Sequence, residues 1–167
     1  MFEGFLLWLE LSAFGVWMRE SPSLFAFPVI LALHTIGLGL LAGINAAMDL
    51  RVLGFAPQIP LAEFRRFLPV MWLGLWINVV SGVALLVAYP AKALTNPVFY
   101  LKLSLIAAAL AILKAVRRGV LVEGDAPVAP MPSIMKRLAV ASLVCWAGAI
   151  VAGRLLAYTY VRFMASD

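Results

Sequence analysis

One histidine, His34, occurs in this chain, inside an apolar run that reads LALHTIGLGLLAGINAAMDL over residues 31–50. Neutral imidazole is a common metal ligand and also a good hydrogen-bonding group. At about 100° per residue, Gly37 and Asn45 fall near the same helical face as His34. Gly37 lacks side-chain bulk, so it is expected to leave space for a flat group beside the imidazole. This face is therefore a candidate site for a bound cofactor.

Two interpretations of His34 follow from its position. An ionisable side chain inside a membrane-like segment is a functional candidate by default, which favours haem b with His34 as an axial ligand to iron. Alternatively, the imidazole forms hydrogen bonds across a helix pair, for instance to Asn78 or Ser81. A haem in a membrane helix bundle usually takes two histidines, so a second ligand would have to come from elsewhere.

Lys102 and Arg154 are the basic residues that lie inside apolar runs, each a short way from the same end of a predicted span. They could bind an anionic group, such as the propionates of a haem. They could also extend toward the membrane surface or pair with acidic residues of the N-terminal segment. Asp49 and Arg51 are expected to form a charge cluster at a helix end.

The residue types exclude several classes of chemistry. With one histidine and one cysteine, Cys145, the chain has no paired-cysteine metal site, no disulfide and no nucleophile–histidine–acid set. We also find no phosphate-binding loop. The sequence therefore gives no positive indication of an enzyme.

The composition predicts an integral membrane protein. Of the 167 residues, 65% are hydrophobic and 13% are charged, and the mean hydropathy is +1.03. Soluble domains carry roughly 25% charged residues. The net charge of +5 comes from residues beside apolar runs, which fits orientation in a bilayer better than binding of nucleic acid. The lipid bilayer is the expected partner.

The fold class predicted from these runs is all-α: a four-transmembrane-helix bundle forming a single domain over residues 1–167. An amphipathic helix over 2–18 precedes it and is expected to lie at the membrane interface. Ser21 and Pro22 are expected to start the first span, and Pro28 could kink it. The spans are expected at about 22–50, 67–89, 97–116 and 134–161.

The distribution of Lys and Arg predicts the orientation. Eight of them flank the two loops at one end, and four lie toward the opposite side. The first group comprises Arg51, Arg65, Arg66, Lys114, Arg117, Arg118, Lys136 and Arg137, and the second Arg19, Lys92, Lys102 and Arg162. The expected location is a bacterial inner membrane, with both termini in the periplasm.

Five stretches carry a resemblance to a family of small four-span bacterial membrane proteins of unknown function: FPVILALHTIG, MDLRVLG, FRRFLPVMW, NPVFYLKL and GRLLAY. More distantly, the chain resembles copper-resistance D and cytochrome-b-like four-helix membrane domains. That resemblance implies haem or copper handling, with His34 as the carried-over ligand. Relatives often have a second histidine near the end of the third span, where this chain reads AILKAVRR, with Lys114 and Arg117.

Three functions are therefore open. The first is a haem b protein that carries electrons or anchors a redox complex, with His34, Gly37, Lys102 and Arg154 at the cofactor. The second is a structural or partner-binding subunit that packs through Gly39 and Gly43, a small-residue pair on the face opposite His34. The third is copper transport, with His34, Met48 and Met71 as successive metal ligands. A homodimer or a larger membrane redox complex is the expected assembly.

Overall fold

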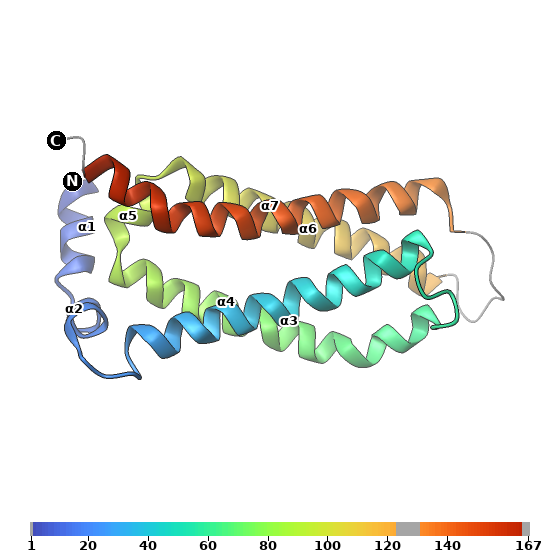
Figure 1. The fold of residues 1–167 in the computed structure, drawn as a ribbon, viewed down its shortest axis with the longest axis horizontal. Coiled ribbons are helices and arrows are strands. Elements are labelled where there is room, and N and C mark those ends of the chain that lie inside the picture. Colours follow the sequence, from blue (N-terminus) through green and yellow to red (C-terminus); the bar gives the residue numbers. More distant parts are fainter. Residues whose placement is uncertain (1, 123–130, 165–167) are drawn as a thin grey trace.

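A computed structural model describes residues 2–122 and 131–164 and has the predicted all-α architecture (Figure 1). Within these ranges, four helices are long and apolar enough to cross a membrane, which makes the chain a multi-pass membrane protein. The long helices are α3 (Phe27–Leu53), α4 (Leu68–Ala88), α6 (Pro97–Val122) and α7 (Ser133–Met164). The short 3₁₀ helix η1 (Leu61–Phe67) leads into α4, and α5 (Pro90–Leu94) connects α4 to α6.

The first span begins later than the sequence suggested. Its helix starts at Phe27 rather than near Pro22, so that Pro28 lies in the first turn and produces no kink. Proline is tolerated there because its missing N–H would have no partner inside the helix. The helix ends at Leu53, followed by Gly54 with a φ of 105°, a left-handed conformation that favours glycine.

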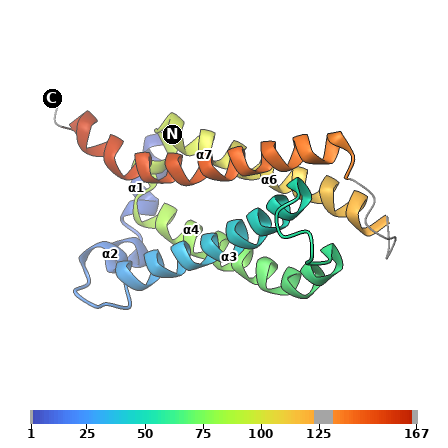
Figure 2. The same cartoon turned by 45° about the vertical axis from the view of Figure 1, so that its right-hand side comes forward.

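The N-terminal segment is two helices instead of the single one expected over 2–18. Helix α1 (Phe2–Glu10) and helix α2 (Ala13–Glu20) are separated at Leu11 and Ser12. The Ser12 hydroxyl accepts a hydrogen bond from the Gly15 backbone N–H, which caps α2 and explains the break. Both helices lie across one end of the bundle (Figures 1 and 2), in the manner of helices at a membrane surface.

The bundle is made of two helix pairs, α3 with α4 and α6 with α7, and α3 also packs against α7. The closest approach of α3 and α4 is at two glycines. A Cβ on Gly37 would lie 2.8 Å from the Gly74 carbonyl oxygen, and one on Gly74 would lie 2.9 Å from the Gly37 carbonyl oxygen. Small residues at a crossing allow helix backbones to pack closely in a membrane.

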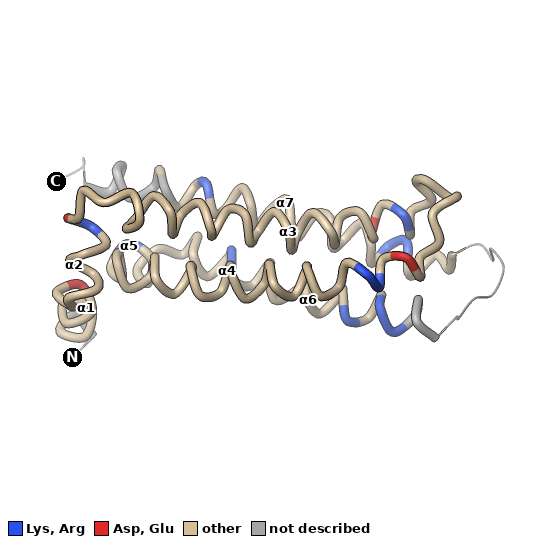
Figure 3. The backbone as a smooth tube through the Cα atoms, turned by 90° about the horizontal axis from the view of Figure 1, so that it is seen from below, with Lys and Arg blue, Asp and Glu red and all other residues tan. Residues whose placement is uncertain are grey.

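Basic residues gather at the end of the bundle opposite the termini, as Figure 3 shows. This is the end where α3 connects to α4 and α6 to α7 (Figure 1). The arrangement agrees with the grouping of Lys and Arg read from the sequence.

Candidate functional site

His34 is held by the neighbouring helix α4 through a reciprocal pair of hydrogen bonds. Its Nδ1 lies 3.1 Å from the Asn78 backbone oxygen, and the Asn78 Nδ2 donates to the His34 backbone oxygen at 2.8 Å. The Ser81 Oγ also lies 3.1 Å from Nδ1. The cross-helix hydrogen bonds considered for Asn78 and Ser81 are therefore present, with the backbone of Asn78 as one of the two acceptors.

These contacts determine the tautomer of the imidazole. A backbone carbonyl can only accept, so the proton of the neutral ring must be on Nδ1. The Ser81 hydroxyl has its own acceptor, the Ile77 backbone oxygen, so it can accept from the same Nδ1–H. The lone pair of His34 is therefore on Nε2.

The His34 Nε2 faces Lys102 of helix α6, whose Nζ lies 3.4 Å away. The ammonium group is a donor, so it donates to this lone pair. Two glycines give the pair room. A Cβ on Gly82 would be 3.2 Å from His34 Cε1, and one on Gly153 would be 3.7 Å from Lys102 Nζ. A basic side chain thus meets a neutral acceptor at a point where α3, α4, α6 and α7 come together.

Among the residues that the structure describes, no ion pair joins Lys102 to a carboxylate. Arg154 was expected near the same site, but its side chain is exposed on α7. The structure therefore brings together His34 and Lys102 and leaves Arg154 outside the cluster. Pairing of these basic residues with Glu10 or Glu20 is not seen, and the third expected partner, the Glu3 side chain, lies outside the described residues.

Gly37 has a different role from the one predicted. A Cβ there would be 2.8 Å from both the Asn78 backbone nitrogen and the Gly74 backbone oxygen. The space beside Gly37 is therefore filled by α4, and no flat group could occupy it.

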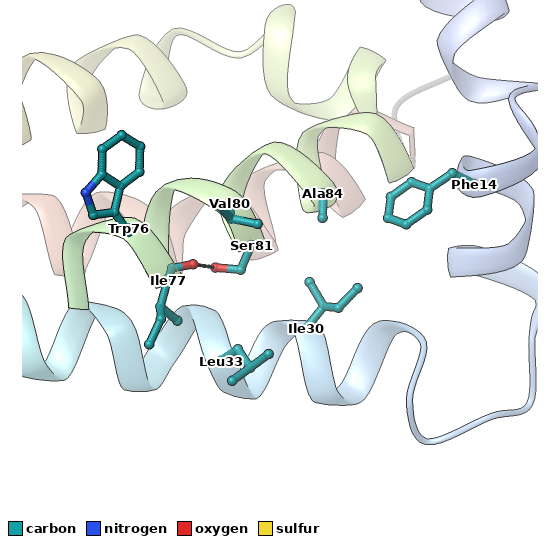
Figure 4. A pocket seen from close by; sticks show the side chains of 8 residues that line it. All are labelled: Phe14, Ile30, Leu33, Trp76, Ile77, Val80, Ser81 and Ala84. Carbon is teal, nitrogen blue, oxygen red and sulfur yellow. Dashed lines mark hydrogen bonds between the residues drawn. The ribbon is translucent and has the colours of Figure 1, made fainter. Parts of the chain in front are cut away.

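An apolar groove has Ser81 of this cluster in its lining (Figure 4). Its volume is about 480 Å³, and it lies between α2, α3 and α4. The lining residues are Phe14, Ile30, Leu33, Trp76, Ile77, Val80, Ser81 and Ala84. Ser81 is the side chain that both lines the groove and contacts His34, so the groove is connected to the polar cluster through one hydroxyl.

The residues around His34 do not fit a haem in this chain. The tautomer would suit an iron ligand, since a ligating histidine usually donates its other N–H to a carbonyl. However, Lys102 lies directly in front of Nε2, and α4 fills the space beside Gly37. Within the described residues, no group of three or more His, Cys, Asp or Glu side chains could hold a metal ion.

Sequence reasoning missed the contact between His34 and Lys102. The available signal was their similar depth, because each lies less than about 12 Å along its helix from the end nearest the termini. Similar depth along two helices does not show that the helices are neighbours or that the two side chains face each other. The contact between His34 and Lys102 could therefore be identified only from the structure.

Comparison with known proteins gives no independent assignment: no family model, no curated protein and no solved structure matches this chain.

Proposed function

We propose that this integral membrane protein binds an isoprenoid quinone in the groove beside Ser81. The observation that carries the proposal is a chain of polar contacts from the groove to the bundle interior. Ser81 Oγ lies 3.1 Å from His34 Nδ1, and His34 Nε2 lies 3.4 Å from Lys102 Nζ. A ligand head group at Ser81 would thus be coupled to the imidazole and, through it, to the lysine.

The groove itself favours a lipid-soluble ligand. Small-molecule sites are usually mostly apolar, with a few polar groups that orient the ligand. Here the walls are aliphatic and aromatic, and Ser81 is the one hydroxyl among the lining residues. Trp76 offers an aromatic face for stacking on a quinone ring. Because the groove lies between helices that cross the membrane, a ligand would reach it from the lipid.

Each polar residue has a defined part in this proposal. The Ser81 hydroxyl would turn from the Ile77 carbonyl to donate to a quinone carbonyl oxygen. The His34 Nδ1–H would then continue to donate to the Ser81 oxygen and keep that hydroxyl correctly oriented. Lys102 would hold the imidazole in this tautomer by occupying Nε2.

Quenching of tryptophan fluorescence by a short-chain ubiquinone tests the proposal on protein in lipid nanodiscs. We expect saturable quenching, with affinity reduced about fivefold in Ser81→Ala because one hydrogen bond is lost. Trp76→Phe should remove most of the quenching. The matched control is Ser104→Ala, since Ser104 also bonds within its own helix, to the Tyr100 oxygen, but lies on α6. Equal, unsaturable quenching of all four proteins would refute a quinone site.

The same preparation tests the haem interpretation. If the packing around His34 is as described, protein produced with added haem should show no Soret band. A band that disappears in His34→Ala would show that the cluster opens to admit the cofactor, and would replace quinone with haem as the proposed ligand.

One observation favours a second candidate, a partner-binding subunit. A Cβ on Gly39 or Gly43 would meet no atom within 4 Å, so this face of α3 is open to another helix. Cross-linking in native membranes tests this alternative. A Gly43→Leu variant that loses a cross-linked species, while retaining quinone quenching, would support a binding face separate from the groove.

A further inference from the structure

A second polar cluster lies in the other half of the bundle, where α3 packs against α7. The Asn45 Nδ2 donates to the Asp49 Oδ2 at 3.0 Å and to the Ser142 Oγ at 2.8 Å. The side chains of Asn45, Asp49 and Ser142 are almost completely buried, with Asp49 at 2% exposure. The cluster is about 16 Å along α3 from His34, since eleven residues separate His34 from Asn45.

No cation is paired with Asp49 in the described part of the chain. Its neighbour Arg51 turns to the following loop and donates to the Ile59 and Pro57 backbone oxygens, so the expected charge cluster of Asp49 with Arg51 does not form. An ionised carboxylate that is buried without a cation is strongly destabilising.

The basic residues on the elements packed nearby do not supply the missing charge. Exposed side chains are found for Arg65 and Arg66 on η1, Lys114 on α6, and Lys136 and Arg137 on α7. Arg117 on α6 is half-buried, and its Nε has no hydrogen-bond partner. Glu63 on η1, the acidic neighbour at this end, pairs with Arg66. None of these groups forms an ion pair with Asp49.

The position of Asp49 in its helix makes a negative charge still less favourable. Asp49 is in the last turns of α3, which ends at Leu53. The C-terminal end of a helix carries a partial negative charge, so it favours cations and disfavours anions. A neutral carboxyl would remove this repulsion.

The hydrogen-bond inventory of the cluster leads to the same conclusion. Two buried polar atoms here have no partner, the acceptor Asn45 Oδ1 and the donor Trp146 Nε1. Trp146 is one turn from Ser142 on α7 and is 2% exposed. The Asn45 Oδ1 can accept a hydrogen bond that it does not receive. A proton on the Asp49 carboxylate would add a donor to the cluster and neutralise the carboxylate.

From this geometry we infer that Asp49 is a proton-binding site inside the membrane, with the Asn45 amide joining its carboxyl group to Ser142 of α7. The ligand is a proton, bound at a carboxylate oxygen. The inference is independent of quinone binding, because it depends on a different helix pair and different residues. A sodium ion is the competing ligand, since the same oxygens could coordinate one.

Infrared difference spectroscopy of the full-length protein in lipid tests the inference. The wild-type minus Asp49→Asn spectrum at neutral pH should contain the C=O band of a protonated carboxyl, which shifts in D₂O and gives way to carboxylate bands at alkaline pH. The matched control is Glu63→Gln, which removes an exposed carboxylate paired with Arg66 and should yield carboxylate bands at neutral pH.

Two results would overturn the inference. One is a neutral-pH difference spectrum for Asp49→Asn that contains carboxylate bands alone. The other is a carboxylate signal at Asp49 that changes when sodium replaces potassium, which would identify a sodium site. If Asp49→Asn does not fold, the wild-type protein can be labelled with ¹³C-aspartate instead. The inference then requires that the C=O band of a protonated carboxyl at neutral pH moves to lower frequency on labelling.

Discussion

Helix α3 carries two polar clusters that differ in how they are connected to the rest of the molecule. The His34 cluster joins α3 to α4 and α6, and Ser81 links it to an apolar groove. The Asn45 cluster joins α3 to α7 and is closed off, with its three polar side chains at most 2% exposed. Between the clusters, the buried core around Leu41 and Met71 is apolar.

The two clusters therefore suit different ligands. At His34, the ring nitrogens both have partners, and the adjoining groove could admit a ligand. At Asn45, the buried acceptor Oδ1 has no donor and the three polar side chains are almost completely buried, so a proton is a more suitable ligand than a molecule. The apolar layer between the clusters implies that they act separately. The following predictions test that separation, from the largest expected effect to the smallest.

The stability of the protein should be most sensitive to a larger side chain at the crossing of α3 and α4. Gly37→Leu places a side chain where α4 backbone atoms lie 2.8 Å from the new Cβ, so we expect loss of the folded protein or destabilisation above about 3 kcal/mol. The matched control is Gly39→Leu, two residues along the same helix, with no atom within 4 Å. Denaturation in mixed micelles measures both variants. Equal destabilisation would show that the crossing is not tightly packed.

Loss of the Asn45 amide should weaken the contact between α3 and α7. Asn45→Ala removes one hydrogen bond to Ser142 on α7 and one to Asp49 on its own helix. We expect a loss of about 1–2 kcal/mol, because an interhelical hydrogen bond in a membrane contributes roughly 0.6–2 kcal/mol. Quinone quenching should be unchanged, because the groove lies elsewhere. A loss of quenching together with stability would show that the clusters are coupled.

Lys102→Met should have a small effect on stability and a larger one on ligand binding. The half-buried Lys102 side chain has no carboxylate partner in the described residues, so we expect an apolar side chain of similar length to change the free energy of unfolding by no more than about 1 kcal/mol. Quinone affinity should fall, because the His34 tautomer is no longer held from Nε2. Unchanged affinity in the same titration would remove Lys102 from the proposed site.

Arg154→Gln should have the smallest effect. The Arg154 side chain is exposed on α7 and contributes to neither cluster, so stability should change by less than about 0.5 kcal/mol. Quinone affinity should also match that of the wild type. A clear loss of stability or of quinone affinity would show that Arg154 belongs to the site, contrary to its exposed position in the structure.

The sequence predicted the fold more completely than the site. Apolar length determined the number of spans, and helical periodicity correctly placed Asn45 inward and Gly39 and Gly43 on the opposite face. The predicted ends of the helices were less accurate. Ser12 could serve as a helix cap or as a surface residue of a continuous helix, and the sequence does not distinguish these roles.

The partners of His34 could be predicted only in part. Asn78 and Ser81 were identifiable because they are polar residues in the next span. Lys102 was not, since its contact depends on how α6 rotates against the α3–α4 pair. Gly37 was misread for a similar reason: a glycine leaves space on one helix, but the neighbouring helix determines whether that space stays empty.

Photoaffinity labelling with an azido-quinone in native membranes is the most direct test of the proposed function. We predict that mass spectrometry will locate the label on the α4 segment from Trp76 to Ala84 and on Phe14, Ile30 or Leu33, the residues that line the groove. Excess unlabelled quinone should compete. Labelling confined to α6 and α7, or equal to that of a photoreactive alkane, would contradict a quinone site beside His34.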